Sequence, residues 1–159
     1  MTDQSKDTAG VIAFPPLLLA AALGFAVVLG FVLPLGILPD ALSPMSLIPG
    51  LALFSLAGLL GLSGIIAFRA AGTNIEPHKP TLVLVYSGPY RLTRNPMYLG
   101  LLMLHLAVTL LASLDWGVLT VIPLALLLHF GVILREERYL AAKFGKDYQN
   151  YLNNTRRWI

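Results

Sequence analysis

The chain has 159 residues, of which 57% are hydrophobic and only 12% are charged, with a formal net charge of +3 and no cysteine. A soluble domain carries about 25% charged residues, so this composition indicates a membrane protein. The lack of cysteine excludes disulfides, thiolate metal sites and cysteine nucleophiles. The three histidines lack the spacing of metal ligands, so we expect no metal. The small positive charge gives no reason to expect a nucleic-acid partner.

Four apolar segments are candidates for membrane-spanning helices, since a hydrocarbon core of about 30 Å needs roughly 20 apolar residues. A short polar tail comes first, and the apolar run after it is too long for a cleavable signal, so we expect a retained helix. Between Ala9 and Phe68 the only Asp, Glu, Lys or Arg is Asp40. The second span carries small residues on one face, which predicts a close helix contact. The spans run from about Phe14 to Leu38, Leu47 to Phe68, Pro96 to Leu114 and Trp116 to Leu134.

The lysines and arginines predict the orientation of these spans. They lie in the N-terminal tail, in the loop between the second and third spans, and after the fourth span, and the other two loops have none. The positive-inside rule then places both termini and the central loop in the cytoplasm. Both polar segments therefore share one side of the membrane and can meet there.

The central loop contains the sequence SGPYRLTRNPMYLG, from Ser87 to Gly100. The preceding residues from Thr81 are β-branched and apolar, which favours an extended segment. Asn95 fits the N-cap of the third span and Pro96 fits its first helical position. The free amides of this helix start, together with Arg91 and Arg94, would form an anion site. Tyr90 and Tyr98 could pack on a ligand, or serve only as interface aromatics.

The fourth span is followed by the acidic pair Glu136 and Glu137. Carboxylates at a helix C-terminus oppose the macrodipole, so either the helix continues or the pair has cationic or hydroxyl-rich partners. We expect the helix to continue to Phe144 and to stop at Gly145. Leu140, Phe144, Tyr148, Tyr151 and Leu152 then recur at helical spacing, which predicts an amphipathic segment that folds back on the membrane surface.

His129 lies seven residues before Glu136 and therefore on nearly the same helix face, roughly 10 Å deeper in the membrane. A histidine inside a span is a functional candidate by default, although it is often only a hydrogen bond between helices.

Two blocks in this order, LVYSGPYRLTRNPMYLG and EERYLAAKFGKDYQNY, resemble the isoprenylcysteine carboxyl methyltransferase family, which is related to the phospholipid N-methyltransferases. The resemblance covers about Thr73 to Ile159. It implies an integral membrane methyltransferase that uses S-adenosylmethionine. The expected fold is an all-α integral membrane protein with four transmembrane helices. Residues 1–72 would form a two-helix scaffold and residues 73–159 the cofactor-binding core.

In that family the cofactor lies in a cytosolic-side pocket formed by the central loop and the C-terminal helical tail. Carried over to this chain, the resemblance implies that the cofactor contacts Leu82, Val83, Leu84, Val85, Gly88, Tyr90, Arg91, Asn95, Pro96, Met97, Tyr98, Glu136 and Glu137. The family often has histidine at the position of Asn95. We assign His129 and Arg94 as candidate catalytic residues. An acceptor that is already an anion needs no base, whereas an ammonium must first lose a proton, and His129 could accept it.

The expected acceptor is lipophilic: a prenylcysteine-type carboxylate, a phospholipid amine or another small hydrophobic molecule. Two other classes stay open at this point. One is a membrane sterol or enone reductase, and the other is a non-catalytic scaffold of the same fold, which would tolerate loss of Glu136 and Glu137.

Overall fold

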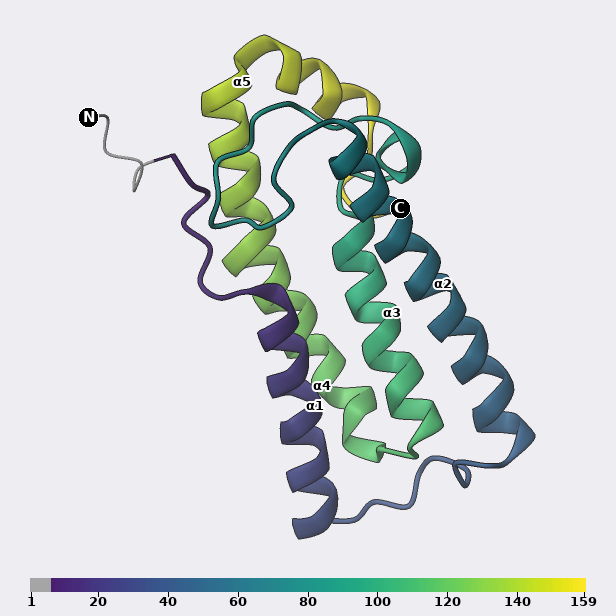
Figure 1. Ribbon diagram of the computed structural model, residues 1–159. Helices are drawn as coiled ribbons and strands as arrows, with labels where there is room; N and C mark the ends of the chain where they lie inside the picture. Colours follow the sequence, from purple (N-terminus) through teal and green to yellow (C-terminus); the bar gives the residue numbers. More distant parts are fainter. Residues whose placement is uncertain (1–6) are drawn as a thin grey trace.

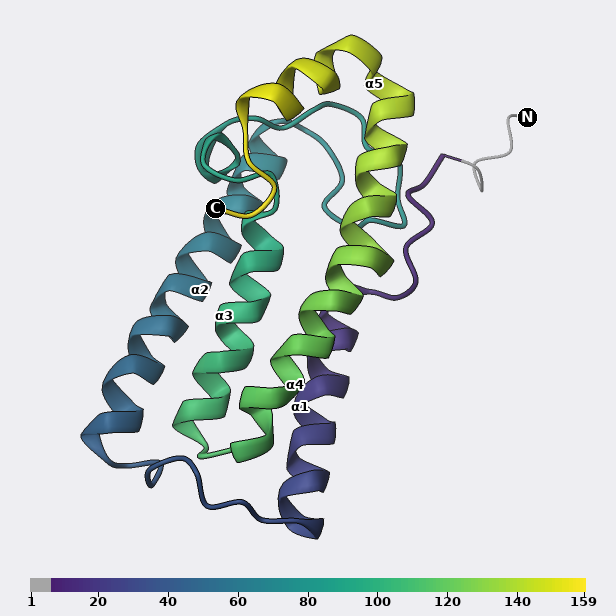
Figure 2. The same ribbon diagram turned by 180° about the vertical axis from the view of Figure 1, so that it is seen from behind.

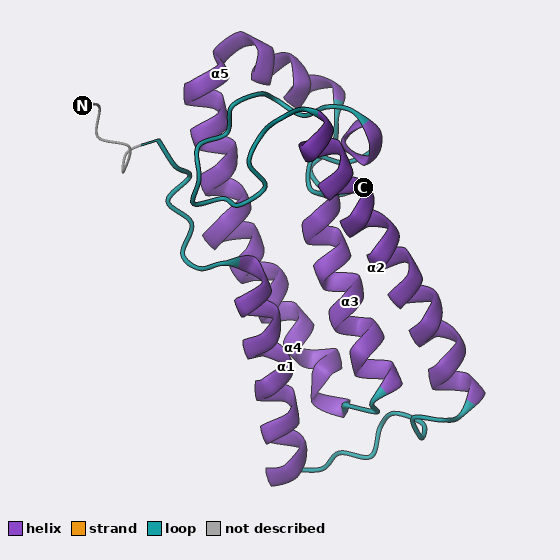
Figure 3. Cartoon of the chain, in the orientation of Figure 1, coloured by secondary structure: helices purple, strands orange, loops and turns teal. Residues whose placement is uncertain are grey.

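The computed structural model describes residues 7–159, and within that range the chain is helical and forms no strand (Figures 1 and 3). In chain order, its elements are α1 (Pro15–Val32), α2 (Pro44–Ala70), the 3-10 turn η2 (Gly88–Arg91), α3 (Pro96–Leu111), α4 (Asp115–Leu126), the π-helical stretch η3 (Leu127–Ile133) and α5 (Leu134–Asn154). The last three form one continuous helix, which bends near its C-terminal end (Figure 1).

The expected class, an all-helical multi-pass membrane protein, is confirmed in outline. Three of the described helices are long and apolar enough to cross a membrane, namely α1, α2 and the continuous helix Asp115–Asn154. The fourth expected span, α3, is a shorter apolar helix of 16 residues. The first span is shorter than expected and ends at Val32 instead of Leu38. The cause is Pro34, which disfavours helical geometry at the residue before it, and Leu33 accordingly has non-helical angles, φ −141° and ψ 77°.

The two ends of the bundle differ in what they carry. The N-terminal segment, the central loop and the end of α5 lie together at one end, and the opposite end carries the α1–α2 connection and the α3–α4 turn (Figures 1 and 2). At that opposite end, the Asp115 carboxylate accepts hydrogen bonds from the backbone amides of Gly36, Ile37 and Leu38, at 2.7 to 3.0 Å. This cluster fixes the irregular α1–α2 connection. The cytoplasmic location of the end that carries the central loop and α5 stays a prediction.

The helices approach closely where the sequence supplies small residues. The predicted small face of the second span is confirmed: a Cβ added at Gly100 of α3 would lie 3.2 Å from the Ala57 carbonyl oxygen and 3.5 Å from the Gly61 nitrogen. Lipid tails are as apolar as the helix surfaces, so the hydrophobic effect does not drive helices together in a membrane. The close van der Waals contact that small residues allow stabilises the helix pair instead. The α3 helix is thereby held firmly along α2.

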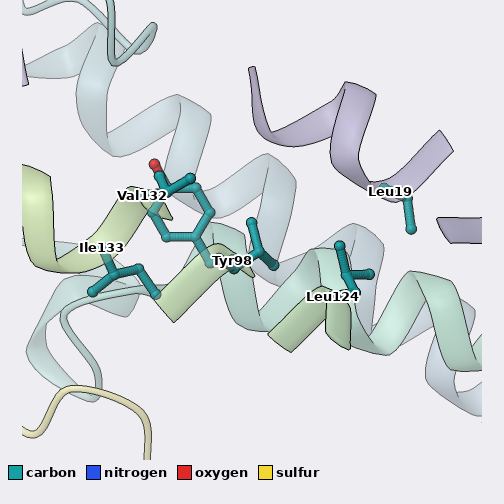
Figure 4. Packing of buried hydrophobic residues seen from close by; sticks show 6 residues of the cluster. Leu19, Tyr98, Leu124, Val132 and Ile133 are labelled. Carbon is teal, nitrogen blue, oxygen red and sulfur yellow. The ribbon is translucent and has the colours of Figure 1, made fainter. Parts of the chain in front are cut away.

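The core between the helices leads directly to the polar end of the bundle. Leu19 of α1, Tyr98 of α3, Leu124 of α4 and Val132 and Ile133 of η3 pack together (Figure 4). Tyr98 is the polar member of this cluster. Its ring is part of the core while its hydroxyl reaches the acidic pair described below, so apolar packing sets the position of that hydroxyl.

Candidate functional site

A cavity of about 80 Å³ lies at the end of the bundle that carries the central loop and α5. Its volume is sufficient for several water molecules. The end of α2, the loop after it, the start of α3 and α5 form its walls, and Ala9 of the N-terminal segment contributes from one side. Segments far apart in the sequence therefore meet at this cavity, as expected for the central loop and the C-terminal tail.

The turn before α3 places a tyrosine in the cavity wall. Gly88 has φ of +59°, a conformation that suits glycine, and Pro89 follows it in the turn η2. The Tyr90 amide closes the turn by donating to the Ser87 carbonyl oxygen at 3.2 Å. The Tyr90 ring is buried against Phe68 of α2, with ring centroids 5.3 Å apart. This turn thus links the end of α2 to the start of α3.

The helix start is where the sequence predicts it, with Asn95 at the N-cap and Pro96 at the first position of α3. The Asn95 side chain, however, does not cap the helix. Its Nδ2 atom donates to the Arg157 carbonyl oxygen at 2.9 Å, and its backbone amide donates to the Thr93 hydroxyl at 3.2 Å. Asn95 therefore connects the start of α3 to the C-terminal end of the chain, a role that the sequence did not indicate.

Glu137 forms ion pairs with two arginines. The Arg94 guanidinium donates to its Oε1 atom at 3.1 Å from Nη2, and Arg157 donates to both carboxylate oxygens, at 2.9 Å from Nε and 2.7 Å from Nη2. The side chains of Arg94 and Glu137 are only 11% and 13% exposed. Hydrogen bonds to Glu137 raise the pKa of the Arg157 guanidinium. Arg91, which the sequence could not distinguish from Arg94, is exposed and lies outside the cavity lining.

Glu136, the other member of the pair, has a different environment. The Tyr98 hydroxyl donates to its Oε1 atom at 2.6 Å. Within residues 7–159 its carboxylate has no ion-pair partner, although the side chain is half-buried and lines the cavity. Neighbouring carboxylates on one helix therefore do different things: Glu137 holds two arginines, and Glu136 faces the cavity without a cation.

The segment before the turn, residues 81–86, was expected to be extended; in the structure it has no regular secondary structure, bends at Val83 and pairs with no strand in the described range. The Thr73 hydroxyl accepts hydrogen bonds from the amides of Leu82 and Val83, at 2.8 and 3.4 Å. Both side chains are exposed and lie outside the lining. Leu84 and Val85 do line the cavity, and across residues 7–159 their amides have no hydrogen-bond acceptor. The backbone next to the cavity is thus free to donate.

The chain after Gly145 forms the remaining wall. Gly145 has φ of 52° and ψ of −120°, and the helix bends there, close to the expected stop. Tyr148 beyond the bend is 2% exposed, and the Tyr151 hydroxyl donates to the Tyr90 carbonyl oxygen at 2.7 Å. The sequence predicted an amphipathic segment that folds back on the membrane surface. Two residues of its apolar face, Tyr148 and Tyr151, line the cavity, and the position of the segment at a membrane surface stays a prediction.

Comparison with known proteins decides the family. Residues 45–147, more than half of the chain, match the sequence profile of the phospholipid methyltransferase family. The chain belongs to this family. It is also 43% identical over 63 residues, 40% of its length, to an uncharacterized protein of Haemophilus influenzae, whose full length is covered. No solved structure matches the chain. The predicted relationship to membrane methyltransferases is therefore confirmed.

Most of the residues predicted to contact the cofactor or to take part in catalysis line the cavity. Those that line it are Leu84, Val85, Tyr90, Arg94, Asn95, Met97, Tyr98, Glu136 and Glu137. Those that lie outside its lining are Leu82, Val83, Gly88, Arg91, Pro96 and His129. Gly88 and Pro96 act through the backbone, since they shape the turn and the helix start.

His129 lies apart from the cavity lining. Its ring stacks on Trp158, with centroids 6.3 Å apart and an interplanar angle of 23°. The expectation that it shares a face with Glu136 assumed an uninterrupted α-helix. His129 lies within the π-helical stretch Leu127–Ile133, so the period of 3.6 does not hold over the residues that lead from it to Glu136. The catalytic role of His129 stays a prediction.

The sequence did not identify several residues of the lining. Tyr139, Leu140, Tyr148 and Tyr151 all come from α5, and Asn74 and Thr81 come from the central loop. The helical spacing of Leu140, Tyr148 and Tyr151 was visible, but that pattern does not distinguish a face against protein from a face against lipid. Nothing in the sequence marks Asn74 or Thr81, since polar loop residues are common.

Proposed function

We propose that this chain transfers a methyl group from S-adenosylmethionine, held in the cavity, to a lipophilic acceptor in the membrane. Membership of the phospholipid methyltransferase family supports a membrane methyltransferase. The observation that carries the choice of cofactor is Glu136, a half-buried carboxylate at the cavity whose hydrogen-bond partner in residues 7–159 is a neutral phenol. An unpaired carboxylate in such a place favours a cationic or hydroxyl-rich ligand.

The groups around the cavity fit the parts of this cofactor. Glu136 would bind its ammonium or its ribose hydroxyls. The free amides of Leu84 and Val85 would donate to its carboxylate or its adenine ring. The rings of Tyr90 and Tyr148 offer aromatic faces for adenine or for the sulfonium. Arg94 and Glu137, which pair with each other, shape the wall of the cavity, and the catalytic role expected for Arg94 stays a prediction.

When bound, the cofactor supplies a methyl carbon already activated by the sulfonium. The protein then has to align the acceptor atom with that carbon and exclude water. Tyr98 joins the cavity to the apolar core of the bundle, and we propose that an acceptor in the lipid phase reaches the cavity from the membrane side. This arrangement suits a prenylcysteine-type carboxylate or a phospholipid amine.

Binding of radiolabelled S-adenosylmethionine to the detergent-purified full chain tests the cofactor. We expect saturable binding that Glu136→Gln weakens at least about tenfold, since a charge-assisted hydrogen bond of about 1.5–3 kcal/mol is lost. Asp147→Asn is the matched control, because Asp147 is an exposed carboxylate of the same helix outside the lining. Absence of binding by folded protein, or protection by NADPH instead, would refute the proposal.

Methyl transfer to two acceptors distinguishes the substrate classes. N-acetyl-S-farnesylcysteine offers a carboxylate, and phosphatidylethanolamine offers an amine. Turnover of the first without a pH-dependent base would favour carboxyl O-methylation, and turnover of the second would favour N-methylation. In the amine case we expect His129→Ala to reduce turnover while cofactor binding is unchanged, and equal turnover would remove His129 from the mechanism.

A further inference from the structure

The chain beyond the Gly145 bend folds back across the end of the bundle (Figure 1). We call residues 146–157 the cover. Tyr148 and Tyr151 on its inner side line the cavity, so the cover is one wall of the site as well as the end of the chain. Because the cover is one wall, its movement would change both the size of the cavity of about 80 Å³ and the access of a ligand to it.

The far end of the cover is joined to the central loop by backbone contacts. The Arg94 amide donates to the Arg156 carbonyl oxygen at 2.9 Å, and Thr93 and Arg156 form a parallel bridge. The Thr93 hydroxyl and the Asn95 amide side chain both donate to the Arg157 carbonyl oxygen, at 3.0 and 2.9 Å. All of these bonds meet at the last few residues of the cover, away from the bend.

One side chain near the end of the cover contacts the opposite wall of the cavity. Arg157 binds both oxygens of Glu137 on the first part of α5, before the bend. The adjacent Arg156 is exposed, and within residues 7–159 its side chain has no hydrogen-bond partner. Arg157 therefore bridges the two parts of α5 that the bend separates, and Arg156 does not.

We propose that Arg157 is a positioning residue that keeps the cover closed over bound cofactor and that the cover opens at Gly145 to exchange it. The inference rests on the proposed function, since the ligand is S-adenosylmethionine. Gly145 suits the hinge because its φ and ψ lie in a region that other residues avoid, and no neighbouring atom lies within 4 Å of its added Cβ. Closure places Tyr148 and Tyr151 against the ligand, and the bidentate pair at Glu137 resists opening.

The test compares Arg157→Ala with the matched control Arg156→Ala in the detergent-purified full chain. Release of radiolabelled S-adenosylmethionine is measured after a chase with unlabelled cofactor. We expect Arg157→Ala to accelerate release by about tenfold or more, because loss of one partner of a partly buried charge pair acts mainly on the dissociation rate. Arg156→Ala should release at the wild-type rate. Arg157→Lys keeps the charge but loses the bidentate geometry, so its rate should lie between the two.

Amide hydrogen exchange provides a readout that does not depend on cofactor. Arg157→Ala should accelerate exchange at Arg94 and in the cover, and leave the amides of α2 and α3 protected. Faster exchange in the cover with an unchanged release rate would overturn the proposal, because the cover would then not gate the site. Unchanged exchange would overturn it as well, since Arg157 would not hold the cover. If the wild-type chain binds no S-adenosylmethionine, the proposed function and the gating role both fail. The exchange data would still decide whether Arg157 holds the cover in place.

Discussion

Substitution of Gly117 by alanine should destabilise the contact between α3 and α4. A Cβ at this position would overlap Oγ1 of Thr109 and would lie 2.8 Å from Cγ2 and 2.9 Å from Cβ of the same residue. The Thr109 Cβ is fixed by its own backbone, so rotation of the side chain cannot relieve all three overlaps. The two helices must therefore separate at their tightest point.

The expected loss can be worked out from two contributions. Overpacking of a tight contact costs about 1–3 kcal/mol. The Gly117 carbonyl oxygen also accepts a hydrogen bond from Nε2 of the buried His105 at 3.0 Å, and its loss adds about 0.5–1.5 kcal/mol. Together, the free energy of unfolding should fall by about 1.5–4.5 kcal/mol.

Unfolding of the detergent-solubilised protein by sodium dodecyl sulfate, followed by tryptophan fluorescence, measures this change. The control is Gly24→Ala on α1, where an added Cβ meets nothing within 4 Å, and it should stay within about 0.5 kcal/mol of wild type. Adding Thr109→Ala to Gly117→Ala should restore part of the loss, because two of the three overlapping atoms disappear. A Gly117→Ala variant as stable as Gly24→Ala would show that the helices do not approach as closely as described.

Three further outcomes are expected. Glu137→Gln should accelerate amide exchange in the cover by at least about tenfold, since both arginine partners lose a charged acceptor, and hydrogen-exchange mass spectrometry measures it. Asp115→Asn should lower the unfolding free energy by about 1–3 kcal/mol, because three backbone amides lose a charged acceptor; a neutral effect in the same detergent titration would contradict this. The Asp7 carboxyl, whose pKa is lowered by its hydrogen bond to Lys143, should keep that contact at neutral pH and lose it as the pH falls through the lowered value; a carboxyl NMR titration with a midpoint at or above the ordinary 3.8 would be inconsistent with it.

The parts of the structure that follow from local sequence patterns were predictable. The apolar segments mark the helices, Asn95 and Pro96 mark the start of α3, and Gly145 marks the bend in α5. Each of these signals acts through the residue's own backbone preference or through a hydrophobic period. The acidic pair, which the sequence placed near the central loop, lines the cavity together with it.

The different contacts of the two arginines and of the two glutamates were not predictable from the sequence, since they depend on residues far apart in the chain. Arg94 binds Glu137 across a separation of 43 residues, and Arg157 binds it across 20. The sequence offers Arg91 and Arg94 as equivalent cations, and only the packing of the central loop distinguishes them. Glu136 and Glu137 were likewise equivalent until their partners were known.

The π-helical stretch in the middle of the last long helix has a consequence for the acidic pair. One residue corresponds to about 100° of rotation in an α-helix, and a π turn accommodates one residue more than an α turn. The wider turn therefore absorbs one residue without rotating the helix beyond it. Deletion of a single residue within 127–133 would return this stretch to an ordinary α-helix and leave the carboxylates on the same side. A residue inserted elsewhere in the helix before Glu136 would instead rotate both carboxylates by about 100°, with every residue that lines the cavity still present in the sequence.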